Sequence, residues 1–369
     1  MDADIQPVRT TGRMVCLDAL RGFDMFWIIG GQWIFGSLDE IFHHPLTAFV
    51  EEQLKHVEWI GFNCEDLIMP LFLFIVGAAM PFSFRRRLQE GKSRRKLYLH
   101  IIKRVAILFL LAMIVKGRLL AFEWSKIYFF CDTLQAIGIG YLITSIIILN
   151  LNIRWQIVAT ALLLLGYWAM VALVPVPGHG AGIYMPQVNL VDYVDHIVLG
   201  RFQFGTASRV ISSMTFGAIV MSGALAGQLL LSGTSHRSKA LRLLAIGIVC
   251  LAVGLLWSNW LPIIKKIWTS SFALAAIGWS YLLLTVFYLI IDVWGYRKWA
   301  FVFIVIGVNA IAVYVATMLF DFRQIGDIFV GGLAGHAGQW KALVQGTGGF
   351  AVVWLILYWM YRTKSFIKI

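Results

Sequence analysis

The sequence predicts an all-α membrane protein, a polytopic bundle of about ten transmembrane helices, and three observations support this. Hydrophobic residues make up 60% of the 369 residues. Charged residues make up only 14%, whereas soluble domains carry about 25%. The apolar residues are also gathered into long runs, and about 20 consecutive apolar residues are what a helix needs to cross a bilayer.

Ten apolar runs can be separated along the chain, and we expect all of 1–369 to form one transmembrane domain. The first run has no small-residue cleavage site after it, so we expect it to remain a membrane helix and not a signal peptide. The expected spans are 14–36, 64–84, 98–119, 128–150, 154–175, 207–232, 240–258, 268–292, 300–320 and 345–362.

The basic residues set the expected orientation of these spans. Segment 85–96, "RRRLQEGKSRRK", carries seven of them, and positive loops stay in the cytoplasm. Alternation then places the tail 1–13, with Arg9 and Arg13, and the C-terminus inside as well. The long loops 37–63, 176–206 and 321–344 fall on the outer side. Topology therefore explains the net charge of +12, and we expect no nucleic-acid partner.

Familiar cofactor motifs are missing from the sequence. Its four cysteines, Cys16, Cys64, Cys131 and Cys250, show no metal-site spacing and no disulfide framework. No phosphate-binding loop, dinucleotide fingerprint or zinc-protease motif appears either. We therefore expect no metal, and a nucleotide-hydrolysing pump is disfavoured.

The first span carries charges near its inner end, in "CLDALRGFDMFWIIGGQW". Charges inside a span are costly and are usually functional. Asp18 and Arg21 are three residues apart, so they share a helix face and can pair. They form either a structural ion pair or part of a cofactor site. Asp24 and Gln32 follow on the same run.

The second span begins with two carboxylates, Glu65 and Asp66, ten residues after His56. Acidic residues in a first turn favour the helix dipole, which is sufficient to explain Glu65. A histidine beside a carboxylate has a second use. The carboxylate can fix the imidazole tautomer and raise its basicity, so that it abstracts a proton near pH 7. This triplet is the strongest candidate site in the sequence.

Further polar residues occur within or at the start of apolar runs, among them Gln135, Ser270 and Asn309. A buried amide or hydroxyl needs a hydrogen-bonding partner in lipid. Bonds between helices explain each residue singly. A shared cavity that binds a cofactor would explain them together.

Several motifs resemble the heparan-α-glucosaminide N-acetyltransferase family, including its shorter bacterial relatives. The similarity runs from residue 17 to the C-terminus. The matching segments are "LDALRG" (17–22), "KHVEWIGFNCEDLIMPLFLFIVGAAM" (55–80), "LQAIGIGYL" (134–142), "VDYVDHIVLG" (191–200), "GVNAIAVYV" (307–315) and "YRTKSFIKI" (361–369).

The resemblance implies an acyltransferase that moves acetyl from cytoplasmic acetyl-CoA, as co-substrate, to the amine of a terminal glucosamine on the other side. The family's active histidine falls on His56, its neighbouring acid on Asp66, and a further polar position on Gln32. It also implies a homodimer surrounded by membrane lipid. Two departures are Ala136 where the family has arginine, and "FGTASRVISSM" where it often has Asp–Pro–Glu–Gly. A luminal domain of the lysosomal enzyme is missing, so we expect a bacterial inner membrane.

The expected mechanism has His56 as the base, or as a carrier that is itself acetylated. Gln32 or Asn309 would donate to the oxyanion, and Arg21 would reach the cofactor. Two alternatives stay open: a transporter or flippase for a sugar or lipid-linked intermediate, and an acyltransferase acting on cell-envelope polysaccharide. Inner-side candidates for the CoA phosphates are Arg85, Arg86, Arg87, Lys103, Arg104 and Arg237.

Overall fold

The computed structural model describes residues 14–91, 93–204 and 210–367. Within these ranges the chain is all-α. The only β contacts there are two isolated bridges, which pair Phe130 with Gln203 and Val176 with Gly180. The predicted fold class is therefore confirmed. The expected cytoplasmic tail 1–13, with Arg9 and Arg13, lies outside the described residues.

Eight helices in the described part of the chain are long and apolar enough to cross a membrane. Each coincides with one of the predicted spans. They are α5 (Cys64–Gln89), α6 (Arg94–Val115), α7 (Thr133–Asn150), α8 (Ile153–Leu173), α10 (Ser213–Leu231), α11 (His236–Trp257), α12 (Ser270–Phe287), which continues into the π-helical turn η5 (Tyr288–Val293), and α16 (Lys341–Arg362).

The two other predicted spans are not straight helices, which corrects the expectation of ten regular spans. The run 300–320 forms α13 (Phe301–Val308) and α14 (Ala310–Leu319), bent by 75° at Asn309. The run 14–36 forms α1 (Val15–Phe26), a π-helical turn η1 (Trp27–Gly31) and α2 (Gln32–Gly36). At Gly30 the backbone leaves the helical region, with φ 167° and ψ −19°. Such π-turns are frequent at functional sites.

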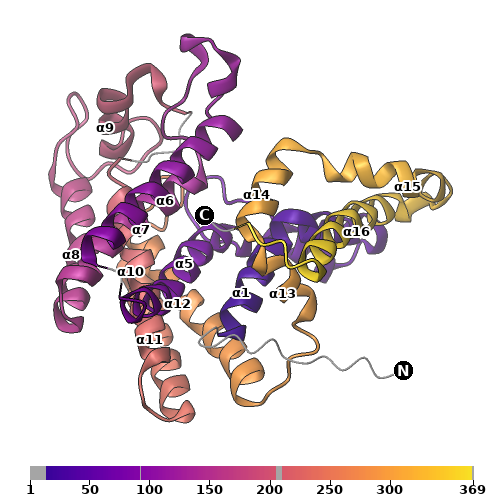
Figure 1. Ribbon diagram of the computed structural model, residues 1–369. Helices are drawn as coiled ribbons and strands as arrows, with labels where there is room; N and C mark the ends of the chain where they lie inside the picture. The colour runs from indigo at the N-terminus through magenta and orange to yellow at the C-terminus, as the bar shows by residue number, and fades with distance from the viewer. Residues whose placement is uncertain (1–13, 92, 205–209, 368–369) are drawn as a thin grey trace.

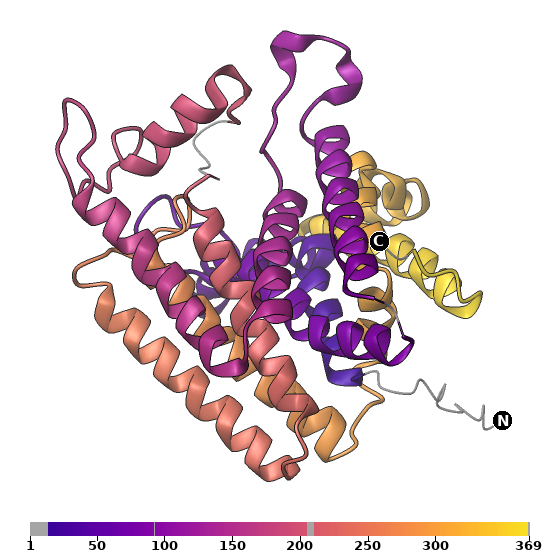
Figure 2. The same cartoon turned by 60° about the vertical axis from the view of Figure 1, so that its left-hand side comes forward.

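The helices form an inner and an outer set. Most of α5, α10 and α12 is buried, whereas α6, α8, α11 and α16 expose much of their apolar surface. Figures 1 and 2 place α8 and α11 on one side of the bundle and α16 on the other. Glycines allow the inner helices to touch, because a Cβ on Gly77 would collide with the Val220 carbonyl, and one on Gly223 with the Phe74 carbonyl. Small residues serve this purpose in membrane helix packing.

The three long loops predicted on the outer side contain helices of their own. Segment 37–63 holds α3 (Leu38–Phe42) and α4 (Pro45–Gln53), and segment 176–206 holds α9 (Leu190–Leu199). Segment 321–344 holds α15 (Phe322–His336), which packs along α16 (Figure 1). The membrane side on which these segments lie stays a prediction. Short 3₁₀ turns occur between the helices at Leu119–Ala121, Trp124–Lys126, Gly200–Phe202 and Gly338–Trp340.

Candidate active site

The start of α5 organises the candidate site. Asp66, in the first turn, is fully buried, and its Oδ2 accepts hydrogen bonds from the backbone N–H of Asn63 at 3.1 Å and of Val57 at 3.4 Å. A side chain that reaches back to the backbone before the helix satisfies donors that would otherwise lack partners. The same two bonds fold the preceding loop against the helix start, and His56 lies on this loop.

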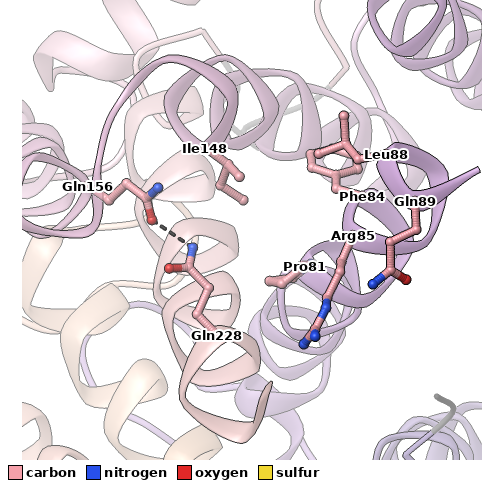
Figure 3. Close-up of a pocket in the computed structure, with 8 residues that line it drawn as sticks. All are labelled: Pro81, Phe84, Arg85, Leu88, Gln89, Ile148, Gln156 and Gln228. Atoms are coloured by element: carbon pink, nitrogen blue, oxygen red, sulfur yellow. Dashed lines mark hydrogen bonds between the residues drawn. The ribbon is translucent and has the colours of Figure 1, made fainter. Parts of the chain in front are cut away.

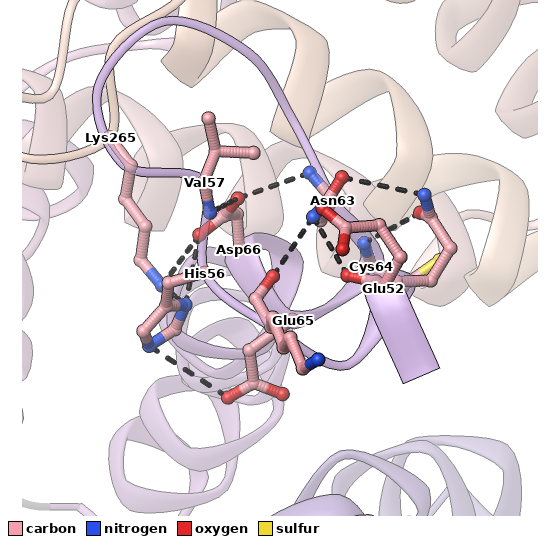
Figure 4. Close-up of polar contacts among 10 residues, drawn as sticks. Glu52, His56, Val57, Asn63, Cys64, Glu65, Asp66 and Lys265 are labelled. Atoms are coloured by element: carbon pink, nitrogen blue, oxygen red, sulfur yellow. Dashed lines mark hydrogen bonds and ion pairs between the residues drawn. The ribbon is translucent and has the colours of Figure 1, made fainter. Parts of the chain in front are cut away.

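His56 lies between two carboxylates (Figure 4). Its Nδ1 is 3.0 Å from Asp66 Oδ1, and its Nε2 is 3.9 Å from Glu65 Oε1. The His56 side chain is 57% exposed, whereas that of Asp66 is 1% exposed. The imidazole can therefore be reached from outside the bundle, while the carboxylate that orients it is enclosed.

A lysine distant in sequence completes the cluster. Lys265 Nζ lies 3.1 Å from His56 Nδ1 and 3.2 Å from Asp66 Oδ1. A backbone hydrogen bond of 2.9 Å from Gly61 N–H to the Ile263 carbonyl holds the two loops together. Sequence reasoning missed Lys265. The available signal was the basic pair Lys265–Lys266 in a segment that the topology places outside, against the usual bias of basic residues.

The neighbouring Lys55 does not join this cluster. Its Nζ pairs with Glu51 Oε1 at 2.6 Å, one turn back on α4. The hydrogen bond to Glu51 raises the pKa of Lys55. The ammonium of Lys55 is thus directed away from His56, and Lys265 supplies the cation at the site.

Glu65 links the histidine to the first span. Its side chain is only 13% exposed, and the Gln32 side chain at the start of α2 lies near its carboxylate. Helix-start electrostatics had been sufficient to explain Glu65 from sequence, but the structure adds contacts with His56 and Gln32. The structure thus brings together three predicted residues, His56, Asp66 and Gln32, with Glu65 between them.

Nδ1 of His56 lies within hydrogen-bonding range of both the Asp66 carboxylate and the Lys265 ammonium, so the tautomer of the imidazole decides its role. When Nδ1–H donates to Asp66, Nε2 keeps a lone pair and can accept a proton from a substrate. Asp66 then stabilises the imidazolium that forms. The described residues contain no group of three His, Cys, Asp or Glu side chains arranged to hold a metal ion.

Five other predicted residues make structural contacts. Arg21 and Asp18 pair as expected, with 3.4 Å between Nη1 and Oδ1. The side-chain oxygen Oε1 of Gln135 accepts hydrogen bonds from the backbone N–H groups of Cys131 and Asp132, just before α7. The Ser270 hydroxyl donates to the Leu164 carbonyl at 2.7 Å. The Asn309 side-chain amide forms hydrogen bonds with the backbone of Ser365 and Ile367 in the C-terminal segment. Their expected roles in cofactor binding remain predictions.

Arg104 is placed differently from these five. Its guanidinium lies over the Tyr141 ring, 4.4 Å from the centroid. Its Nε is buried and has no hydrogen-bonding partner among the described residues. Arg104 therefore stays a candidate for an anionic ligand on the inner side.

A groove opens near the other end of α5 (Figure 3). It has a volume of about 530 Å³, with one charged side chain, Arg85, and several amides. Gln228 Nε2 donates to Gln156 Oε1 at 2.7 Å across its floor. The lining residues are Pro81, Phe84, Arg85, Leu88, Gln89, Ile148, Gln156 and Gln228. From Asp66 to Arg85, α5 rises roughly 28 Å at 1.5 Å per residue.

Fold and site together define a class: a multi-pass, all-α membrane protein with a histidine, two carboxylates and a lysine at the mouth of a buried helix. Comparison with known proteins adds a more particular likeness. A family described as a domain of unknown function (DUF5009) matches residues 13–146, which include His56, Glu65 and Asp66.

Two curated relatives align with the whole chain. The chain is 23% identical to heparan-alpha-glucosaminide N-acetyltransferase of Mus musculus, over 437 aligned positions, and 24% identical to the Homo sapiens protein of that name, over 439. It covers 63% and 62% of their lengths, which is less than two thirds of each. The expected resemblance is thus supported at low identity.

Proposed function

We propose that the chain is a transmembrane acetyltransferase that moves the acetyl group of acetyl-CoA to the amine of glucosamine or of a glucosamine-terminated saccharide. The observation that carries the proposal is the 3.0 Å contact between His56 Nδ1 and Asp66 Oδ1. It leaves a partly exposed Nε2 as a base. The acetyltransferase names of the two relatives supply the reaction class.

The proposed reaction uses the cluster as follows. His56 Nε2 takes a proton from the acceptor amine, whose nitrogen attacks the thioester carbonyl. Asp66, supported by Lys265, orients the ring and stabilises its charge. Gln32 is the proposed donor to the developing oxyanion. In a second route His56 Nε2 is itself acetylated and then transfers the group.

The donor is proposed to enter from the cytoplasm and the acceptor from the outer side of a bacterial inner membrane, with the protein acting as a homodimer. Arg85 in the inner groove is the proposed contact for the CoA phosphates, with Arg21 and Arg104 as further cations. Since α5 separates the groove from His56 by roughly 28 Å, the thioester has to enter the bundle to reach the histidine.

An acceptor screen tests the proposal. Purified protein in lipid nanodiscs would be incubated with acetyl-CoA and, in turn, glucosamine, glucosamine-terminated oligosaccharides and muropeptides, with products identified by mass spectrometry. We expect acetylation of a glucosamine amine. Acetylation of muropeptides alone would instead indicate a cell-envelope acyltransferase. Absence of both acetyl-CoA binding and acetylation would contradict the proposal and favour a transporter.

The two routes can be separated with acetyl-CoA alone. The protein would be mixed with labelled acetyl-CoA without acceptor, quenched and digested. Label on the peptide that contains His56 would support the acetyl-histidine route. An unlabelled peptide, from protein that acetylates glucosamine under the same conditions, would support direct transfer.

A further inference from the structure

Asp24 is a carboxyl group buried inside the bundle without a hydrogen-bonding partner. Its residue is 1% exposed, and neither side-chain oxygen has a hydrogen bond among the described residues. It lies on α1, three residues before the π-helical turn η1. An ionised carboxylate without a partner is very costly in an apolar interior, so such a group holds a proton instead. Neither the expected ion pair of span 1 nor the proposed base accounts for it.

Glu65 connects this buried carboxyl with the histidine. Its Oε1 lies 3.9 Å from His56 Nε2, while its Oε2 is buried and has no partner in the described structure. Asp24 lies on α1, which packs against α5, the helix that carries Glu65. An exposed imidazole, a largely buried Glu65 and a buried Asp24 thus occur on neighbouring elements.

We propose that Asp24 is the acid that protonates the departing CoA sulfur, and that Glu65 returns a proton to it from His56. This inference deepens the proposed acetyltransferase function and rests on it. The nitrogen–carbon bond forms and the carbon–sulfur bond breaks. The amine proton goes to His56 Nε2, and the Asp24 proton goes to the sulfur. The His56 proton then passes to Asp24 through Glu65, so the site ends as it began.

The need for this second acid follows from where the two substrates approach. The amine gives up its proton at the outer end of the bundle, whereas the sulfur leaves through the apolar interior. A bare thiolate released there would be an unpaired buried charge. No hydrogen bond joins Glu65 to Asp24 in the described structure, so the return step requires the Glu65 side chain to rotate inward, toward the Asp24 carboxyl.

Infrared spectroscopy tests the proton on Asp24 without any reaction. A protonated carboxyl has a carbonyl band that shifts when H₂O is replaced by D₂O. We expect the wild-type protein in nanodiscs to show such a band and Asp24→Asn to lose it. The matched control is Asp292→Asn, because Asp292 is also a membrane carboxyl but accepts a hydrogen bond from Cys16 N–H at 3.2 Å. A band that survives Asp24→Asn would overturn the proposal, as would a wild-type spectrum without it.

Kinetics test the use of that proton. We expect Asp24→Asn to lower kcat by roughly 10²-fold, the scale of acid–base catalysis, with little change in the KM for acetyl-CoA. Asp24→Glu, which can still carry a proton, should recover at least part of the loss. Unchanged kcat in Asp24→Asn would overturn the proposal, and so would equal loss in the Asn and Glu variants at wild-type acetyl-CoA affinity.

Failure of this inference is distinguishable from failure of the proposed function. If wild-type protein acetylates glucosamine and Asp24→Asn does so equally well, only the role of Asp24 is lost. If wild-type protein acetylates no acceptor, the acetyltransferase proposal is lost and the kinetic role of Asp24 is overturned with it. The infrared band still decides whether Asp24 carries a proton.

Discussion

The two ends of α5 present opposite surroundings. At the first turn, His56 lies within hydrogen-bonding or ion-pairing range of Glu65, Asp66 and Lys265, and Lys265 also pairs with Asp66. At the last turns, Arg85 is the one charged side chain, among the residues the structure describes, that lines a groove of about 530 Å³. The first end has reactive groups held close together, and the second has an open groove beside a strongly basic segment.

This difference indicates a division of labour along one helix. Reactive groups need fixed geometry, which the bonds from Asp66 to His56 and to the α5 start provide. A large ligand needs volume and a few polar contacts, which the groove provides. Within the proposed function, the first end carries the chemistry and the second end accommodates part of the donor. Each prediction below changes one end and leaves the other intact.

Replacing His56 with alanine should have the largest effect. We expect acetyl transfer to fall by roughly 10²–10⁴-fold, since a general base contributes that much. The fold should persist because the His56 side chain is 57% exposed. Product formation would be followed by mass spectrometry, with His179→Ala as the matched exposed histidine. Near-normal transfer by the His56 variant would remove the base from the mechanism.

The Asp66–Lys265 pair should dominate the stability of this end. Asp66→Asn removes the carboxylate charge 3.2 Å from Lys265 Nζ. Breaking a buried pair costs roughly 3–5 kcal/mol, and we expect the lower end because Lys265 is partly exposed. The free energy of unfolding would be measured by denaturant titration in micelles.

The double variant Asp66→Asn/Lys265→Met provides the control for that measurement. If the two charges interact, the double variant loses less stability than the sum of the single variants. Strict additivity would show that the pair is not a unit, and the cluster would then be held by its backbone contacts alone.

A substitution in the groove should change the affinity for acetyl-CoA and leave the rate of acetyl transfer unchanged. A hydrogen bond to a charged group contributes about 1.5–3 kcal/mol, so Arg85→Ala should raise the KM for acetyl-CoA by roughly tenfold at unchanged kcat. Arg94→Ala, an exposed arginine at the start of α6 outside the groove, is the control. An unchanged KM would move the phosphate contact elsewhere, with Arg21 and Arg104 as the next variants to examine.

The smallest expected effect is at the groove floor. Gln228→Leu removes the donor of the 2.7 Å bond to Gln156, a contribution of about 0.5–1.5 kcal/mol. We expect a small fall in thermal stability, measured by scanning fluorimetry, with full acetyl transfer retained. A large loss of transfer would show that the two ends of α5 are coupled.

The sequence was sufficient for the fold class because apolar run length alone identifies a membrane helix. It was not sufficient for the broken spans. The run 300–320 is apolar on both sides of Asn309, and only the folded structure reveals the 75° bend at this residue. Glycine pairs such as Gly30–Gly31 mark flexible positions without specifying which one leaves the helix.

Only the part of the candidate site that is close in sequence could be predicted. His56 and Asp66 lie ten residues apart, so local pattern and family resemblance both point to them. Lys265 is 209 residues from His56, and no local pattern reports a contact formed by two docked loops. Asp24 was visible as a charge in a span, but its lack of hydrogen-bonding partners is a property of the folded interior.

The bend at Asn309 has a practical consequence for handling the protein. Asn309 Oδ1 accepts from the Ile367 backbone N–H at 3.1 Å, and its amide donates to the Ser365 carbonyl at 3.3 Å. An affinity tag fused after residue 369 would be separated from this attachment by two residues, 368 and 369. A tag at the amino end leaves the Asn309 hydrogen bonds to the C-terminal segment undisturbed. Comparing yield and thermal stability before and after proteolytic removal of a carboxyl-terminal tag would show whether such a tag disrupts them.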